Sequence, residues 1–177
     1  NRYYDQLDIP RQESYIEDVK TASVVAESKR PLVYRNLRSA AESGWDFSSR
    51  WFRDGKHITT IQTTSIIPVD LNALLYHTEI TLAKSWEGSG NKLKATYYRQ
   101  LANLRKKSIN KYCWSQKEGW YKDYNIAARQ QTPSLSLAGM FPFFLKMSDT
   151  TKLKAASKVI VSKFLKPGGL VTTSVHT

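Results

Sequence analysis

The residues that could do chemistry gather in one short stretch, Ser43–Phe52, which reads Ser-Gly-Trp-Asp-Phe-Ser-Ser-Arg-Trp-Phe. Its aspartate, Asp46, stands between two large aromatic residues, Trp45 and Phe47. A carboxyl group held against a dry aromatic wall has its charged form disfavoured, so its pKa rises. Such a carboxyl group can act as a proton donor near neutral pH. A simpler interpretation also stands, in which Asp46 caps a helix and the aromatic side chains belong to the core.

Other residues near the two ends of this stretch suit a polar, flat ligand. Gly44 permits backbone angles that other residues avoid, and it lets a ligand approach the main chain closely. Aromatic faces such as that of Trp45 match the apolar C–H faces of sugars. Further upstream, Arg11 can donate to sugar hydroxyls and Glu13 can accept from them. The alternative for this second pair is a surface ion pair at the start of a helix.

Helices must position these groups, because apolar residues recur at helical spacing along most of the chain. One helix follows Pro10 and ends near Lys29; the others are expected over 32–43, 71–86, 92–112 and 149–165. Gly44 ends the second helix, so Asp46 lies in the loop that follows. Asp70 is expected to cap the third helix, and Asp123 to stabilise a turn.

The remaining segments are expected to be irregular or extended. The β-branched residues of 58–69 favour extended structure, and 170–175 is expected to be extended as well. Pro142 predicts a kinked or broken helix within 134–147. Helix, loop and helix thus alternate with loops of uneven length, which predicts an all-α fold and one domain over 1–177.

Composition argues against several classes of protein. The net charge of +12 is dispersed over helix faces, so nucleic-acid binding is not expected. Cys113 is the only cysteine, and the three histidines are scattered (His57, His77, His176), so we predict no disulfide, no metal site and no cofactor. No apolar run reaches the roughly 20 residues that a membrane span needs. No signal peptide is visible, and the compartment and the oligomeric state stay open.

The order of residues carries a further signal. The run Gly44–Trp51, preceded by Arg38-Ser39-Ala40-Ala41-Glu42-Ser43, closely resembles the stretch around the catalytic acid of trehalases. These are inverting glycoside hydrolases that split α,α-trehalose into two glucose molecules. Two further segments resemble the same family: Pro10–Tyr15, which matches its Pro-Arg-Pro-Glu-Ser-Tyr motif, and Pro68–Tyr76.

The resemblance implies a fold, a substrate and a set of site residues. The fold is an (α/α)6 toroid, the substrate is trehalose, and the product is glucose. Asp46 takes the role of general acid. The substrate-binding positions are Arg11, Gln12, Glu13, Gly44 and Trp45. Gln12 stands where the family has proline, so the turn before the first helix departs from the family pattern.

The family's Pro-Gly-Gly-Arg-Phe and Gln-Trp-Asp-x-Pro-x-Gly-Trp signatures are absent from these 177 residues. An inverting glycosidase needs a second carboxylate, roughly 6.5–9.5 Å from the acid, to activate water. No residue here matches the family's general base. We therefore expect a partial catalytic domain that is inactive in isolation, exposes apolar faces and self-associates.

Two other functions remain open at this point. The chain could be a catalytically inactive sugar-binding or interaction fragment that keeps Arg11, Glu13, Gly44 and Trp45. It could also be a basic helical module that binds nucleic acid, in which case binding would weaken steeply with salt.

Overall fold

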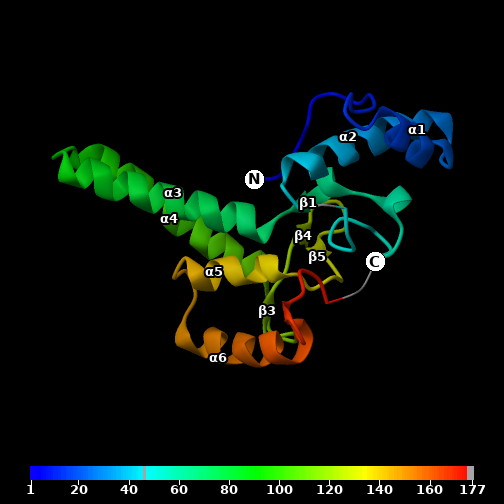
Figure 1. Cartoon of the computed structure of the whole chain (residues 1–177). Coiled ribbons are helices and arrows are strands. Elements are labelled where there is room, and N and C mark those ends of the chain that lie inside the picture. Colours follow the sequence, from blue (N-terminus) through cyan, green and yellow to red (C-terminus); the bar gives the residue numbers. More distant parts are fainter. Residues whose placement is uncertain (46, 175–177) are drawn as a thin grey trace.

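The structure is a computed structural model that describes residues 1–45 and 47–174; Asp46 and residues 175–177 lie outside the described residues. Helices dominate it (Figure 1): α1 (Tyr15–Ser23), α2 (Arg30–Glu42), α3 (Val69–Gly88), α4 (Lys92–Tyr112), α5 (Phe141–Phe144) and α6 (Thr150–Val159). The expected helical class is confirmed. Short antiparallel strands are added to it: β1 (Ile66–Ile67), β2 (Trp114–Ser115), β3 (Trp120–Tyr121), β4 (Tyr124–Asn125), β5 (Gln130–Gln131), β6 (Leu165–Lys166) and β7 (Gly169–Leu170).

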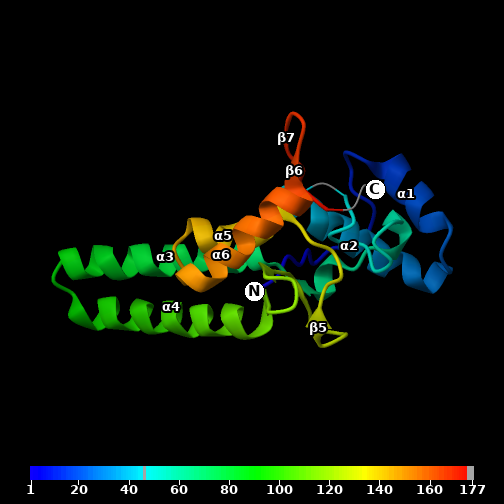
Figure 2. The same cartoon turned by 90° about the horizontal axis from the view of Figure 1, so that it is seen from below.

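Figures 1 and 2 show an elongated arrangement. The hairpin of α3 and α4 projects at one end, and α1 and α2 lie at the other end. The strands pair in three small sheets, ordered β1-β4-β5, β2-β3 and β6-β7. Helices α5 and α6 lie beside the base of the hairpin. The chain therefore passes from the end of α2 to the start of α3 near the middle of the molecule, where the acid loop (Gly44–Phe52) lies.

Helix α1 is shorter than its sequence predicts, because it ends at Ser23 and not near Lys29. A short 3-10 turn, Glu27–Lys29, follows before α2. The Ser23 hydroxyl donates to the carbonyl of Lys20 at 2.7 Å, and such local bonds compete with helix propagation. Ala22 is fully buried against α2 whereas Val24 is 70% exposed, so packing also favours the break.

The segment 58–69 is extended only over β1, so the prediction of an extended segment was mostly wrong. Two 3-10 turns, Ile58–Thr60 and Thr63–Ser65, occupy most of it. Thr64 donates its backbone N–H to Oδ1 of Asn36 in α2 at 2.8 Å, where a strand would need a partner strand. Strand propensity describes how a residue fits a sheet, and here α2 occupies the place of a neighbouring strand.

The long hairpin follows its sequence pattern closely. Helix α4 has the predicted bounds, and α3 extends the predicted 71–86 by two residues at each end. Alanines at the shared face are buried and let the helices approach (Ala73, Ala83, Ala95, Ala102), while large apolar residues point outward. The expectation that Asp70 caps α3 was wrong, because Pro68 holds that position. Within the described ranges, no helix has both the length and the apolar character to span a membrane.

The C-terminal third is broken as Pro142 predicts. A 3-10 turn, Leu137–Met140, leads into the single turn of α5. Gly139 packs so tightly that a Cβ atom there would lie 2.3 Å from Nε1 of Trp120. Asp149 caps α6 by accepting from the N–H of Lys152 at 2.8 Å, and a π-helical turn continues α6 to Phe164.

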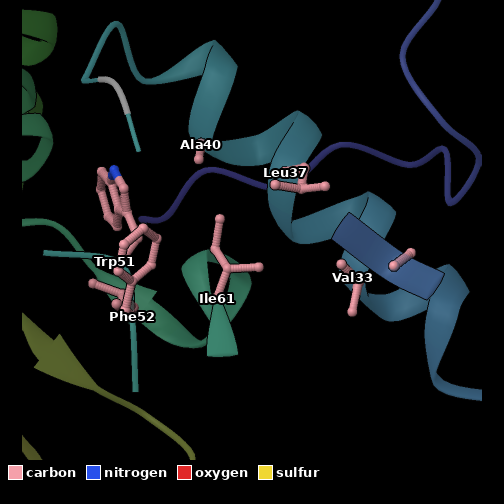
Figure 3. Close-up of a cluster of buried hydrophobic side chains, with 8 residues drawn as sticks. Val33, Leu37, Ala40, Trp51, Phe52 and Ile61 are labelled. Carbon is pink, nitrogen blue, oxygen red and sulfur yellow. The ribbon is translucent and has the colours of Figure 1, made fainter. Parts of the chain in front are cut away.

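The core beneath α2 is the part that supports the acid loop (Figure 3). Val33, Leu37 and Ala40 of α2 face Trp51, Phe52 and Ile61, and all six are buried. The spacing of the three α2 residues puts them on one face of the helix. Trp51 and Phe52 are the last two residues of the acid loop and are buried, so the loop returns to the core immediately after position 50.

Candidate functional site

The acid loop leaves α2 through a left-handed glycine. Gly44 has φ +69°, a conformation that side-chain-bearing residues rarely adopt, and it is exposed. Ser43 binds the chain on both sides of this glycine: its Oγ donates to the carbonyl of Ala40 at 2.6 Å and accepts from the N–H of Trp45 at 3.0 Å. The predicted helix end at Gly44 is confirmed. The predicted acid, Asp46, lies outside the described residues.

Trp45 lies against an arginine that the sequence did not single out. The guanidinium of Arg50 lies 4.5 Å from the ring centre of Trp45 and 4.5 Å from that of Trp51. Such contacts let the positive charge interact with the electron-rich ring faces. Nε1 of Trp51 also donates to the carbonyl of Trp45 at 3.3 Å. The residue before position 46 is thus held by its ring and by both of its backbone polar groups.

Arg50 is in turn held by two aspartates from distant parts of the chain. Its Nη1 and Nη2 donate to Asp70 at 2.9 and 2.6 Å, and its Nε and Nη2 donate to Asp123 at 2.7 and 3.0 Å. All three residues are almost fully buried. We call this cluster the Arg50 trio. It has one cation and two carboxylates, so its formal charge is −1.

The pKa of Arg50 follows from the groups around it. Burial by itself disfavours the charged guanidinium, but the charge of Asp123 and the hydrogen bonds of Asp70 outweigh it and raise the pKa of Arg50. Asp123 also accepts from the N–H of Val69 at 2.9 Å. Asp123 therefore joins the loop to the first turn of α3, and does not simply stabilise a turn as predicted.

Arg11 is held in a similar way by one aspartate. Its Nε and Nη2 donate to the two carboxylate oxygens of Asp18 at 3.0 and 2.7 Å, and its backbone N–H donates at 2.9 Å. These bonds raise the pKa of Arg11. Its guanidinium lies 5.1 Å from the ring centre of Phe47. The bonds to Asp18 use Nε and Nη2 of Arg11 and do not involve Nη1.

The structure brings two of the predicted groups together. The contact between Arg11 and Phe47 joins the turn before α1 to the acid loop, although the two are far apart in sequence. Gln12 and Glu13 lie next to Arg11 in the chain and are exposed. Gly44 and Trp45 lie on the other side of position 46. The described site residues thus lie in the acid loop and in the turn before α1, and they provide aromatic faces and arginine donors.

Sequence reasoning missed Asp18 and Arg50 as members of this site. Asp18 carries a weak signal, since it lies in the first turn of a helix that starts just after Arg11. Arg50 lies in the acid-loop run itself, but nothing local indicates its partners, because Asp70 and Asp123 lie 20 and 73 residues away. No motif links such positions, and only the fold brings them together.

Two cavities lie away from this loop. One of about 310 Å³ lies between α3 and α4 and includes Arg105 and Glu79; another of about 670 Å³ includes Arg53, Gln62 and Lys122. Neither is lined by a predicted site residue. Among the described residues, no group of three or more His, Cys, Asp or Glu side chains could hold a metal ion.

Comparison with known proteins decides the family. The family model described as Trehalase matches residues 1–177. The chain belongs to the trehalase family. Trehalases are glycoside hydrolases, as the acid-loop resemblance implies. The chain is 45% identical to a periplasmic trehalase of Salmonella dublin over 179 aligned residues, which cover 100% of this chain and 31% of that protein. A periplasmic trehalase of Salmonella paratyphi B is 44% identical with the same coverage. The chain thus spans about a third of the length of these trehalases.

Solved structures show the same fold. Neutral trehalase Nth1 from Saccharomyces cerevisiae superposes with a TM-score of 0.72 and 20% identity, over 91% of this chain and 29% of that protein. A mannosylglycerate hydrolase of glycoside hydrolase family 63 from Thermus thermophilus gives a TM-score of 0.56 and 15% identity, over 87% of this chain and 38% of that protein. The trehalase chain described here therefore has the fold of a segment of these larger helical enzymes.

Proposed function

We propose that the protein to which this chain belongs hydrolyses α,α-trehalose to two glucose molecules by inverting general acid–base catalysis, with Asp46 as the general acid. The observation that carries the proposal is the 45% identity to a named trehalase across all 177 residues. Within that match, the acid loop keeps the family's Gly-Trp-Asp-Phe-Ser-Ser-Arg-Trp run. The surroundings of the loop suit a polar sugar, which combines apolar faces with hydroxyl groups.

The proposed substrate contacts are Arg11, Gln12, Glu13, Gly44 and Trp45. Arg11 offers Nη1 donors from a fixed position, because Asp18 holds the other edge of its guanidinium. Trp45 offers an aromatic face, and Gly44 leaves room for close approach to the backbone. Gln12 and Glu13 are exposed beside Arg11 and can donate and accept.

The second carboxylate that an inverting enzyme needs is proposed to lie outside this chain. Every buried carboxylate of the described residues is already bound to an arginine: Asp18 to Arg11, Asp70 and Asp123 to Arg50, and Glu79 to Arg105. A carboxylate whose oxygens accept hydrogen bonds from an arginine is not free to accept a proton from an attacking water molecule. We accordingly propose that residues 1–177 form one part of a catalytic domain built as an (α/α)6 toroid.

The test is glucose release from trehalose by the full-length protein and its Asp46→Asn variant. We expect the wild-type protein to be active and the variant to lose about 10²–10⁴-fold in kcat, the usual contribution of a general acid. Asp54→Asn is the matched control, because Asp54 is an exposed aspartate on the turn after the loop. Its activity should equal that of the wild type.

Two results would contradict the proposal. Full activity of Asp46→Asn would remove Asp46 from the acid role. A wild-type protein that binds trehalose without releasing glucose would favour the alternative of an inactive sugar-binding protein.

A further inference from the structure

We propose that Arg50, held between Asp70 and Asp123, is a positioning residue for the acid loop: it fixes Trp45, and with it the main chain that leads into position 46. The inference rests on the function proposed above. It assigns a role in the reaction to Arg50, which belongs to the acid-loop run, and to Asp70 and Asp123, which lie 20 and 73 residues further along the chain.

The first step is that the guanidinium plane of Arg50 is fixed. The guanidinium donates four hydrogen bonds of 2.6 to 3.0 Å, two to the carboxylate of Asp70 and two to that of Asp123. A guanidinium carries only five N–H donors, so nearly all of them are used. Bidentate pairing on two sides prevents rotation in the plane and tilting out of it. The flat faces of Arg50 are therefore presented in one orientation.

The second step is that both carboxylates are tied to the same rigid element. Asp123 accepts from the N–H of Val69, and Asp70 accepts from the N–H of Leu71, each at 2.9 Å. Both donors belong to the first turn of α3. This turn begins the long hairpin that Figure 1 shows projecting from the molecule. The orientation of Arg50 is thus fixed relative to the first turn of α3.

The third step links this platform to the loop. The rings of Trp45 and Trp51 lie on Arg50, each at 4.5 Å. Nε1 of Trp51 donates to the carbonyl of Trp45, and the backbone N–H of Trp45 donates to Oγ of Ser43. The carbonyl of Trp45 belongs to the peptide bond that joins it to residue 46. If Arg50 loses its orientation, both tryptophans lose their support and this peptide is free to shift.

Stability alone is a weak explanation for such a cluster. The desolvation of three buried charges largely offsets their attraction, and apolar replacements of buried ion pairs are often as stable. Two bidentate ion pairs, one with Asp70 and one with Asp123, give the guanidinium of Arg50 a defined orientation. A displacement of a reacting group by about 1 Å can lower a rate about 100-fold, so geometry of this kind matters for a catalytic acid.

The experiment compares two substrates in the full-length protein. Trehalose has a sugar leaving group that needs a proton from the acid, whereas α-D-glucopyranosyl fluoride releases fluoride, which needs little acid assistance. Arg50→Lys keeps the positive charge but cannot form two forks or a flat stack. We expect its kcat on trehalose to fall about 100-fold. Turnover of the fluoride should fall less than about fivefold, because acid catalysis contributes little there.

A merely structural role gives a different pattern. If Arg50→Lys only reduces the amount or rigidity of folded protein, both substrates are affected equally, and the inference is wrong. Unchanged trehalose turnover also overturns it. If Arg50→Lys does not fold, as judged by circular dichroism, the same comparison is made with Asp123→Asn, which keeps the shape of the cluster and one carboxylate.

A matched control is Arg105→Lys, since Arg105 of α4 forms a partly buried, bidentate ion pair with Glu79 of α3. Its two turnover rates should keep their wild-type ratio.

Asp46→Asn, measured alongside, separates this inference from the proposed function. A selective loss of trehalose turnover in Asp46→Asn together with an equal loss of both substrates in Arg50→Lys overturns the positioning role alone. Full trehalose activity of Asp46→Asn overturns the proposed function and the positioning role with it.

Discussion

The two aromatic residues beside position 46 are each held by an arginine, and each arginine is held by buried carboxylates. Arg50 lies on Trp45 and is bound by Asp70 and Asp123; Arg11 lies on Phe47 and is bound by Asp18. The two arginines differ in their remaining donors. Arg50 has used almost all of its N–H groups, which suits a structural support, whereas Arg11 keeps Nη1 free of Asp18, which suits a substrate contact.

Asp18→Asn tests this difference. The amide cannot accept both bonds of the guanidinium fork, and its NH₂ group opposes the arginine donors, so Arg11 loses its orientation. We expect the KM for trehalose to rise about tenfold and the unfolding free energy to fall by about 3 kcal/mol, the usual cost of breaking a buried pair. Steady-state kinetics and urea unfolding of the full-length protein measure both.

The control for this change is Asp8→Asn. Asp8 pairs with Arg35 at 3.2 Å and its side chain is 49% exposed, so the cost should stay below about 1 kcal/mol and KM should not change. If Asp18→Asn destabilises the protein but leaves KM unchanged, Arg11 has no part in binding trehalose.

At the scale of elements, the site is set by where helices begin and end. The acid loop starts at the C-terminus of α2, and the partners of Arg50 lie at or beside the N-terminus of α3. Further along, β3 joins α4 to α6. The hydroxyl of Tyr121 donates to Oδ1 of Asn110 in α4 at 2.7 Å and lies 3.2 Å from Oγ of Ser148, just before α6. A single side chain thus connects three elements around the base of the hairpin.

This connection predicts a loss of stability at high pH. Burial raises the pKa of Tyr121 from 10.0 to about 12. Between these values the unfolded chain has lost the proton while the folded chain keeps it, so stability falls as pH rises. Below pH 10 the contribution is fully present. We expect the thermal unfolding midpoint of the wild type to fall from pH 10 to 12 more steeply than that of Tyr121→Phe.

Comparison with Tyr121→Phe is the appropriate control, because the other tyrosines and lysines titrate in both proteins and cancel in the difference. At neutral pH the variant should be less stable by about 1 kcal/mol, since Asn110 loses a hydrogen-bond donor. Parallel curves for the two proteins over this range would show that Tyr121 does not titrate with a raised pKa.

At the scale of the whole molecule, the described surface carries many large apolar side chains. Leu93 is 87% exposed, Leu104 65% and Tyr97 56%, all on the outer faces of α4. Monomeric soluble proteins seldom expose such residues together. The chain also spans only 31% of the length of related trehalases. Both observations agree with a chain whose outer helix faces are covered by other parts of a larger domain.

The isolated 177-residue chain is therefore expected to self-associate and to release no glucose from trehalose. Size-exclusion chromatography with light scattering measures the first property, and a glucose assay measures the second. Replacing Leu93 and Leu104 by glutamine should reduce the association, whereas replacing the exposed Lys92 and Lys107 by glutamine should not. A monodisperse monomer, or activity of the isolated chain, would contradict the expectation.

Local signals explain what could be predicted from the sequence. The bounds of α4, the break at Pro142 and the helix end at Gly44 depend on residues within one or two turns of each other, so periodicity, proline and glycine reveal them. The order of residues around Asp46 and Arg11 indicated the family, because a long run rich in tryptophan rarely matches by chance. Where these local signals compete with packing, as in 58–69, the prediction failed.

Long-range contacts were decided only by the tertiary structure. Nothing in the spacing of Arg50, Asp70 and Asp123 indicates that they meet, because hydrogen bonds between side chains 20 and 73 residues apart leave no local pattern. The sequence by itself indicated the helical class, the bounds of the long hairpin, the loop and the family of this chain. The packing of α2, α3 and the β3–β4 segment decided which charges hold the loop, since a buried arginine is stable only where the fold brings carboxylates to it.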